Sequence, residues 1–203
     1  RAAHEAVATS VSEMGEAIDQ HGIKCEWRNG GLMVVATNRP QQERIDADLA
    51  AAEALGLDGF RRLSGDEAQA EVHSPTYVGG LHEAHCGVLH PAKLARGLAR
   101  VVNRSGAEVF ERSDVTGIDE VAGRIRITTP RGRVDADQVV LATNAWASET
   151  EWFRHKVVPL YTYIAMTEPL SAEQWDAMGW DSHCGVEDKR NYVHYYRRTL
   201  DGR

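Results

Sequence analysis

Cysteines and long apolar runs are scarce in this sequence. The three cysteines, Cys25, Cys86 and Cys184, are odd in number and far apart, which argues against a disulfide framework and indicates reduced thiols. No apolar stretch approaches the ~20 residues of a membrane-spanning helix, and the N-terminus lacks the basic and apolar segments of a signal peptide. We therefore expect no membrane partner and a cytoplasmic location.

Positive charge is also limited. The 203 residues include 23 Lys and Arg against 30 Asp and Glu, a formal net charge of -7 at pH 7, and the basic residues form no stripe. Nucleic acids are recognised through such stripes, so we expect no nucleic-acid partner. The sequence also lacks a Gly-x-Ser-x-Gly nucleophile turn, a phosphate-binding Gly-x-x-x-x-Gly-Lys loop and a close pair of carboxylates suited to acid/base chemistry.

The most informative stretch that is present is 139–142, Val-Val-Leu-Ala. A short, continuous apolar run rich in β-branched residues predicts a strand that is buried on both faces of a parallel sheet. Thr143 and Asn144 follow, and their short side chains allow a ligand to approach or a helix to be capped. Because ligands of open α/β sheets bind at the carboxyl ends of strands, we expect a ligand at this turn. The alternative is a strand end, a helix cap and, at Trp146, an aromatic side chain that fills the core.

Apolar residues at spacings of three and four predict three amphipathic helices, over 1–22, 40–56 and 91–106. A proline stands at the start of the second and third helix, and a glycine ends each of the three. The residues expected to face inward are Val7, Val11, Met14, Ile18, Ile45, Leu49, Ala52, Leu55, Leu94, Leu98, Val101 and Val102. Two capping boxes predict two further short helices, and their residues are Ser64 with Glu67 and Ser171 with Gln174.

Short strands separated by turn residues are predicted elsewhere. Asn29 and Gly30 favour a type I′ turn, which predicts a hairpin of strands 25–28 and 32–35. A three-stranded antiparallel meander with glycine in its turns is expected before the apolar run. The further strands are expected over 107–111, 115–121, 124–129, 133–135, 157–167 and 192–197.

The order of a helix, a strand, a three-stranded meander and a buried strand resembles one known family. Together with the segments VVLATNAW, LHPAKLARGLARVV and VVPLYTYIAMTEPL, it is similar to the FAD-dependent oxidoreductases of the D-amino-acid oxidase and glycine/sarcosine oxidase type. The resemblance implies a mixed α/β fold, with an incomplete FAD-binding Rossmann-like domain that contains the meander and with part of an antiparallel-sheet substrate domain. The glycine-rich fingerprint that cradles the FAD pyrophosphate in that family is missing from these residues.

The resemblance also implies how the chain is divided. Residues 1–22 would form a helix of the FAD-binding domain and residues 81–150 its second half, whereas residues 23–80 and 151–203 would belong to the substrate domain. The helical pattern begins at the first residue without a cap, and the last three residues begin a turn without a returning strand. We therefore expect the chain to be an internal piece of a longer protein.

The resemblance assigns cofactor-binding residues at two places. The turn that contains Ala142, Thr143, Asn144 and Trp146 would run beside the flavin and its ribityl chain. The backbone of Val115 would contact the adenine, and a simple strand start is an equal alternative at that position.

Three tyrosines and an arginine are considered for substrate binding. Tyr161 and Tyr163 share one face of the strand expected there, as do Tyr195 and Arg197 on another strand. A guanidinium beside Tyr hydroxyls can hold a carboxylate through two parallel, charge-assisted hydrogen bonds. We expect Tyr163, Tyr195 and Arg197 to contact the substrate, with an amphipathic strand and a solvated Arg as the alternative. No catalytic residue is identified.

A histidine-rich segment raises the question of a metal site. His82, His85, Cys86 and His90 lie close together in the sequence. A structural zinc site usually has two tight ligand pairs separated by a longer loop, and no second pair follows here. We expect no metal ion at this cluster, which instead resembles the family's link into the helix that starts at Pro91.

The function that the resemblance implies is oxidation of the C–N bond of a small-molecule amine or amino acid by hydride transfer to FAD. A cofactor that carries the difficult chemistry agrees with the lack of a protein nucleophile. Without the glycine-rich fingerprint, we expect these residues alone to be inactive. Two alternatives stay open: a non-catalytic binding or assembly module on an oxidoreductase-like scaffold, and a metal-dependent hydrolase that uses the histidine cluster.

Overall fold

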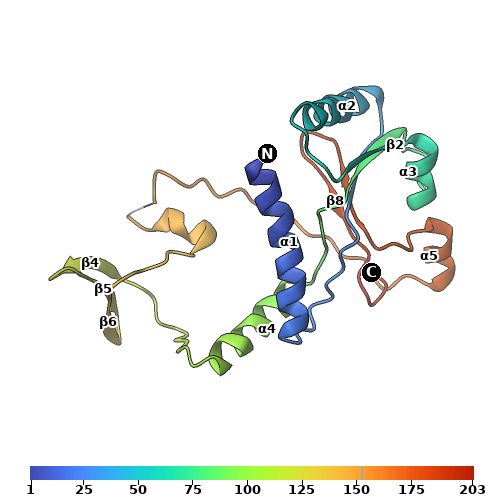
Figure 1. Ribbon diagram of the computed structural model, residues 1–203. Coiled ribbons are helices and arrows are strands. Elements are labelled where there is room, and N and C mark those ends of the chain that lie inside the picture. Colours follow the sequence, from blue (N-terminus) through green and yellow to red (C-terminus); the bar gives the residue numbers. More distant parts are fainter. Residues whose placement is uncertain (152) are drawn as a thin grey trace. The chain divides into compact units, whose positions relative to one another are not determined.

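The computed structural model describes residues 1–151 and 153–203, which form two compact units (Figure 1). The large unit comprises Arg1–Gly106 and Met166–Arg203, and the meander unit comprises Ala107–Ala165. The chain therefore leaves the large unit once and returns to it. The expected division into FAD-binding and substrate domains concerns function and stays a prediction.

A five-stranded sheet is the framework of the large unit. Its strands are β1 (Leu32–Ala36), β2 (Phe60–Ser64), β3 (Gly79–Glu83), β7 (Gly185–Asp188) and β8 (Tyr195–Tyr196), in the order β2-β3-β1-β7-β8. β1 pairs antiparallel with β3 and parallel with β7, so the sheet is mixed rather than purely antiparallel. Of the strand predicted over 192–197, the structure retains β8. A Cβ atom at Gly80 of β3 would lie 2.5 Å from the Val34 carbonyl oxygen, a close approach that glycine permits.

The described part of the large unit has five α-helices, α1 (Ala2–Gln20), α2 (Arg39–Ala54), α3 (Gly65–Glu71), α4 (Pro91–Arg104) and α5 (Ala172–Met178). A proline occupies the first turn of α2 and of α4. Glycines with positive φ follow α1, α2 and α4, where a left-handed residue ends the helix. Both capping boxes form, at the starts of α3 and α5. The predicted helices are therefore confirmed, and so is the mixed α/β class.

Strand β1 is buried on both faces, and each face has its own core. Its side chains alternate between the faces, as the strand period of two requires. The core on one face consists of Met33, Val35, Leu63, Ala68, Val72, Trp175, Trp180, Cys184 and Val186. The core on the other face consists of Val34, Ala36, Ile45 and Leu81. α3 and α5 thus pack on one face and α2 on the other, while a third cluster joins α1 to α4.

The meander unit contains a three-stranded antiparallel sheet. Its strands are β4 (Gly117–Val121), β5 (Arg124–Thr129) and β6 (Gly132–Ala136), paired in that order. Ala122 and Gly123 both have positive φ, 52° and 75°, as a type I′ turn requires. Arg126 donates two hydrogen bonds to the Asp135 carboxylate across β5 and β6, at 2.7 and 2.9 Å. The predicted meander is confirmed.

The strand predicted over 139–142 is wrong. These residues belong to no strand, Val140 is 88% exposed, and a 3-10 helix, η1 (Asn144–Glu149), follows. A strand in a parallel sheet needs hydrogen-bonded neighbours on both sides, and the described residues offer none at this segment. The strands predicted over 107–111 and 157–167 are wrong for the same reason.

The hairpin predicted between 25–28 and 32–35 is also wrong. β1 forms, but the segment before it makes an isolated bridge instead of a strand, from Arg28 to Val88. β3 and β7 occupy both edges of β1, so no edge is left for a strand from 25–28. The positive φ falls on Gly31, at 75°, rather than on the two predicted turn residues.

Several residues that were expected to face inward are exposed, namely Val7, Leu55, Leu98 and Val102. Val7 lies on α1, Leu98 and Val102 lie on α4, and Leu55 is the residue that follows α2. None of the described helices combines the length and apolar character that crossing a membrane requires.

Candidate functional site

The large unit contains a cavity of about 760 Å³. Its walls come from the end of α1, the segment that follows it, the start of α4 and the residues after β8. Small-molecule sites have volumes of this order and a few convergent polar groups. The polar groups that matter here are those of Lys24, Glu26, His90, Lys93 and Arg197.

Arg197 brings a positive charge to the cavity wall directly after β8. Its Nη1 donates a hydrogen bond to the carbonyl oxygen of Leu89, the residue before His90. A guanidinium has five N–H donors, so this bond fixes the side chain and leaves other donors for a ligand. Within the described residues, Arg197 forms no ion pair with a carboxylate, whereas the neighbouring cavity cation Arg203 pairs with Asp201 at 2.8 Å.

Lys93 and Glu26 form an ion pair at the same cavity. Lys93 lies in the first turn of α4, and the Glu26 side chain is largely buried. Glu26 has a φ of 61°, a left-handed conformation that is uncommon for a residue with a side chain. Such backbone strain is frequent at ligand sites. The pair balances two of the cavity's charges and so leaves the Arg197 charge available.

His90 lines the cavity, and one nitrogen of its ring is buried. Its backbone N–H donates to the Cys25 carbonyl oxygen at 2.7 Å, which joins the start of α4 to the segment after α1. Its Nδ1 is buried and has no hydrogen-bond partner among the described residues. Buried polar atoms are usually paired, so a ligand in the cavity is a reasonable partner for this nitrogen.

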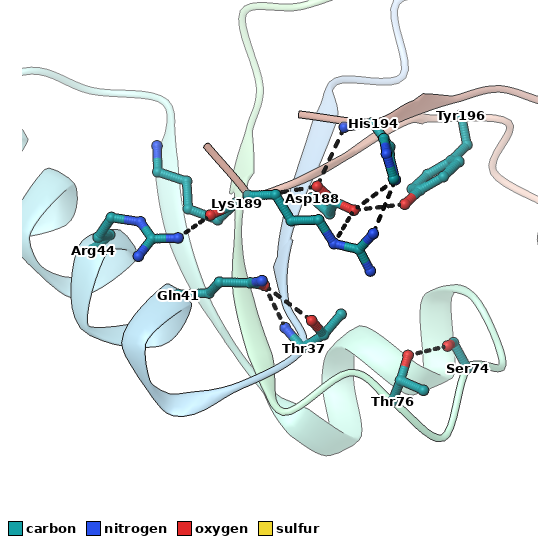
Figure 2. Close-up of polar contacts among 10 residues, drawn as sticks. Thr37, Gln41, Arg44, Ser74, Thr76, Asp188, Lys189, His194 and Tyr196 are labelled. Atoms are coloured by element: carbon teal, nitrogen blue, oxygen red, sulfur yellow. Dashed lines mark hydrogen bonds and ion pairs between the residues drawn. The ribbon is translucent and has the colours of Figure 1, made fainter. Parts of the chain in front are cut away.

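A buried carboxylate, Asp188, holds the connection between β7 and β8 (Figure 2). Asp188 is 1% exposed. It accepts hydrogen bonds from the Tyr196 hydroxyl at 2.9 Å and from the backbone N–H groups of His194 and Arg190 at 3.2 and 3.3 Å. The Arg190 side chain adds an ion pair at 3.1 Å.

The surroundings of Asp188 set the ionisation of the pair that it forms with Tyr196. Burial by itself would raise the pKa of Asp188, but the hydrogen bonds from Tyr196, His194 and Arg190 outweigh it and lower the pKa. Burial and the Asp188 carboxylate raise the pKa of Tyr196 to about 12. Tyr196 is therefore a stable donor, and its bond to Asp188 fixes the strand that leads into Arg197.

The end of β7 is also tied to α2, as Figure 2 shows. Arg44 donates to the carbonyl oxygen of Lys189, and the Lys189 ammonium pairs with Asp48 at 2.6 Å. At the start of the same helix, the Gln41 side chain accepts hydrogen bonds from the Thr37 N–H at 2.8 Å and the Thr37 hydroxyl at 3.1 Å. The contacts of Lys189 with Arg44 and Asp48 hold the β7–β8 connection from a second side, whereas the Gln41 bonds fix the start of α2 to the end of β1.

The predicted cofactor-binding residues all lie in the meander unit. Val115 precedes β4 and is exposed. Ala142 and Thr143 belong to no helix or strand, and Asn144 begins η1 with a φ of 49°. Trp146 is exposed rather than a core aromatic. The backbone over 138–143 forms no hydrogen bond with the described residues.

These residues fit one edge of an FAD site. Their short side chains and free backbone N–H and C=O groups are suited to close contact with a cofactor. The glycine-rich segment that would cradle a pyrophosphate is not among the 203 residues. Their role stays a prediction.

The predicted substrate residues are divided between the two units. Arg197 lines the cavity and Tyr195 is an exposed residue of β8 opposite Glu187, both in the large unit. Tyr163 belongs to the meander unit and is 97% exposed. The sequence did not single out Lys24, Glu26 or Lys93. Lys93 is 67 residues from Glu26, and such a distance gives no signal of a shared cavity.

The histidine-rich segment does not converge. His82 Nε2 lies 3.4 Å from the Gly30 carbonyl oxygen, while His90 lines the cavity. Burial, followed by the nearby Glu83 and Glu187 charges, raises the pKa of Cys86, which disfavours the thiolate that binds metals. Among the described residues, one group of potential metal-binding side chains is close enough to share an ion, and His85 is its single member from this segment.

Comparison with known proteins places the chain in a family. The FAD dependent oxidoreductase family (DAO) matches it over residues 1–203. The probable oxidoreductase OrdL of Haemophilus influenzae is 27% identical over 199 residues, which cover 96% of this chain and 46% of that protein. The gamma-glutamylputrescine oxidoreductase of Escherichia coli is 31% identical over 190 residues, which cover 93% of this chain and 44% of that protein.

A solved structure agrees with the sequence comparison at the level of the fold. L-proline dehydrogenase from P. horikoshii is similar with a TM-score of 0.73 and 17% identity, over 97% of this chain and 52% of that one. The chain spans about half the length of the curated relatives that it matches. The family matches the whole sequence, and the helices and the meander that the sequence predicts are present. The chain therefore belongs to the family of FAD-dependent oxidoreductases.

Proposed function

We propose that the intact protein oxidises the C–N bond of a small-molecule amine or amino acid that carries a carboxylate. The observation that carries this proposal is the cavity, where the Arg197 guanidinium has no carboxylate partner among the described residues and the buried His90 Nδ1 has no hydrogen-bond partner there. One relative is named for gamma-glutamylputrescine, and another is a glycine oxidase. Both names agree with a nitrogen-containing substrate.

FAD, when bound, supplies the acceptor for the hydride that leaves the substrate carbon next to nitrogen. We assign one edge of its site to the backbone of Val115 and to Ala142, Thr143, Asn144 and Trp146. The exposed, unpaired backbone of that segment and its short side chains support the assignment. The 203 residues contain no glycine-rich segment that would cradle the pyrophosphate, and we therefore infer that these residues alone do not catalyse the reaction.

The side chains of the cavity bind and orient the substrate. Arg197, which donates to the Leu89 carbonyl oxygen, also donates hydrogen bonds from its free N–H groups to the substrate carboxylate. His90 forms a hydrogen bond through Nδ1 to a polar group of the substrate. The Lys93–Glu26 pair supports the wall and contributes no net charge, so the selection for an anion comes from the other cations of the wall, Arg197 among them. Tyr195 of the large unit is proposed as a further contact, and the role of Tyr163 stays a prediction.

Two measurements test the proposal. The intact protein, supplied with FAD, should show flavin absorption near about 370 and 450 nm, where oxidised flavins absorb. Anaerobic addition of the correct amine or amino acid should then bleach the band near 450 nm. A preparation that takes up no flavin would leave the alternative of a non-catalytic module.

The carboxylate preference can be tested separately with matched compounds. Each amino acid that bleaches the flavin is compared with the amine of the same skeleton that lacks the carboxylate. We expect the amino acid to bleach the flavin at lower concentration. Equal responses would remove Arg197 from substrate recognition and leave the oxidoreductase assignment intact.

A further inference from the structure

The large unit brings His4, Asp58 and His85 together from three distant places in the sequence. Asp58 lies two residues before β2, and His85 lies two residues after β3. β2 and β3 are antiparallel with Phe60 opposite Glu83, so both side chains emerge at the same end of the sheet. A backbone hydrogen bond of 2.8 Å, from the Ala84 N–H to the Gly59 carbonyl oxygen, fixes the two segments side by side.

The third member of the group, His4, comes from the first half of α1. Its ring packs on Phe60 with ring centroids 5.5 Å apart, and it meets the His85 ring edge-on at 5.7 Å. Gly59 makes room for His85: its φ is 82°, and a Cβ atom there would lie 2.4 Å from the ring. Both imidazoles are thus held in place by packing beside Asp58.

The distances within the group match those between the ligands of one metal ion. Asp58 Oδ1 lies 3.3 Å from His4 Nε2 and 3.5 Å from His85 Nε2, and all three atoms lie within 4.8 Å of one another. Tetrahedral ligands that are each 2.0–2.1 Å from zinc are about 3.3–3.4 Å apart. Two of the three separations are therefore close to the value that a shared ion requires, and the third is at most 4.8 Å.

The chemistry of the donors also suits a metal ion. Two imidazoles and one carboxylate are a common ligand set for Zn²⁺ with water at the remaining position. His85 Nε2 is buried and lacks a hydrogen-bond partner within the described chain. Asp58 is exposed, which leaves the fourth ligand position open to water.

We infer that His4, Asp58 and His85 form a binding site for a divalent ion of the zinc type, with each imidazole bound through Nε2 and Asp58 through Oδ1. None of these residues lines the cavity assigned to the substrate. The bound ion joins α1 to the end of the β2–β3 pair. Its expected effect is therefore on the stability of the large unit, because a ligand that binds the folded state stabilises it by mass action.

The test is calorimetric titration of the untagged, intact protein with Zn²⁺. We expect one equivalent to bind, and we expect His4→Gln and His85→Gln each to weaken binding by at least about tenfold because a ligand is lost. His21→Gln is the matched control, since His21 is an exposed histidine at the other end of α1. This control should bind as the unmodified protein does.

Thermal unfolding supplies the second measurement. Zn²⁺ should raise the melting temperature of the unmodified protein and of His21→Gln, and should raise it less for Asp58→Asn. Asp58 is 84% exposed, so this variant decides the question even where a histidine variant fails to fold. Absence of Zn²⁺ binding by the unmodified protein would overturn the proposal, as would unchanged affinity in Asp58→Asn and in the folded histidine variants. The group would then be a packed cluster of side chains with one hydrogen bond, between His4 and Asp58.

Discussion

The two units contain similar apolar sequences in opposite environments. β1 of the large unit reads Leu-Met-Val-Val-Ala, and the segment 139–142 of the meander unit reads Val-Val-Leu-Ala. Val35 is fully buried, whereas Val140 is largely exposed. The difference lies in the partners: β3 and β7 flank β1, while no described strand pairs with 139–142. An apolar run thus indicates that a buried strand is possible, and its neighbours decide whether the strand forms.

The largest expected effect comes from placing the same charge in both segments. Val35→Asp puts an unpaired carboxylate into the core on one face of β1, and we expect a loss of more than ~4 kcal/mol, enough to unfold the large unit. Val140→Asp in the 203-residue chain should change the free energy of unfolding by less than ~0.5 kcal/mol. Urea unfolding followed by tryptophan fluorescence reports on the large unit, because Trp175 and Trp180 lie in its core.

The intact protein provides the control for this comparison. If further strands flank 139–142 there, Val140→Asp should become strongly destabilising. If Val140→Asp leaves the free energy of unfolding of the intact protein unchanged as well, the explanation that 139–142 lacks strand partners is contradicted.

The second effect concerns two carboxylates with lowered pKa values, buried Asp188 of the large unit and Asp135 of the meander unit. Asp188→Asn removes the charge from a buried network, and we expect a loss of about 1–3 kcal/mol. Asp135→Asn should cost less, because water can replace its partner. The free energy of unfolding of each variant is measured by chemical denaturation. Equal losses would show that burial does not decide how much each carboxylate contributes to stability.

The pH dependence of unfolding tests the hydrogen-bonded pair of Asp188 and Tyr196. Since the folded state lowers the pKa of Asp188, its stabilisation is present above the unfolded-state pKa of about 3.9 and is lost as pH falls through the lower folded-state value. Tyr196 has the opposite sign: with a pKa raised to about 12, its stabilisation is present below about pH 10 and is lost as pH rises toward the raised value. Tyr196→Phe should cost about 1 kcal/mol and abolish that alkaline loss.

The third effect concerns the cavity of the large unit. Arg197→Lys keeps the charge but loses the paired N–H donors, so we expect KM for a carboxylate-bearing substrate to rise about tenfold, with a smaller change in kcat. Arg198→Lys is the matched control, because Arg198 stacks on Trp175 at 4.4 Å and donates to the Trp180 carbonyl oxygen. Equal KM values for the two variants would count against a substrate role for Arg197.

The smallest effect is expected at the β4–β5 turn of the meander unit. Ala122 has a φ of 52°, a conformation that costs an L-residue about 1–2 kcal/mol and that glycine adopts freely. Part of this gain is offset because glycine makes the unfolded chain more flexible. Ala122→Gly should therefore stabilise the meander by a few tenths to ~1 kcal/mol. Protection of the β4–β5 amides against hydrogen exchange measures it, and reduced protection would contradict the argument.

Helices were predicted better than strands, because their signals are local. The capping box of Ser64 with Glu67 and the glycines after α1, α2 and α4 lie within a few residues of the helix ends that they determine. The partners of β1 are decided by distant segments, and β7 lies about 150 residues further along the chain. The apparent turn at Asn29 and Gly30 was therefore overridden by strands that the local sequence does not announce.

The residues of the candidate site were also difficult to predict where they come from distant parts of the sequence. Arg197 could be proposed from the period of two along a strand, and the structure places it at a cavity. Glu26 and Lys93 meet there from segments 67 residues apart, and His4 and Asp58 are 54 residues apart in sequence. Such pairs carry no motif, because their spacing follows from the whole fold rather than from one element.

The parallel pairing of β1 with β7 sets an order of events during synthesis. β1, β2 and β3 leave the ribosome early, but the strand that completes the other edge of β1 is made about 150 residues later. At ordinary translation rates this interval is roughly 8 to 30 seconds. Throughout that time β1 presents a free, apolar edge, which can pair with another nascent chain. The step most open to aggregation is therefore expected before residue 188 is made, and a chaperone that covers this edge should raise the yield of folded protein.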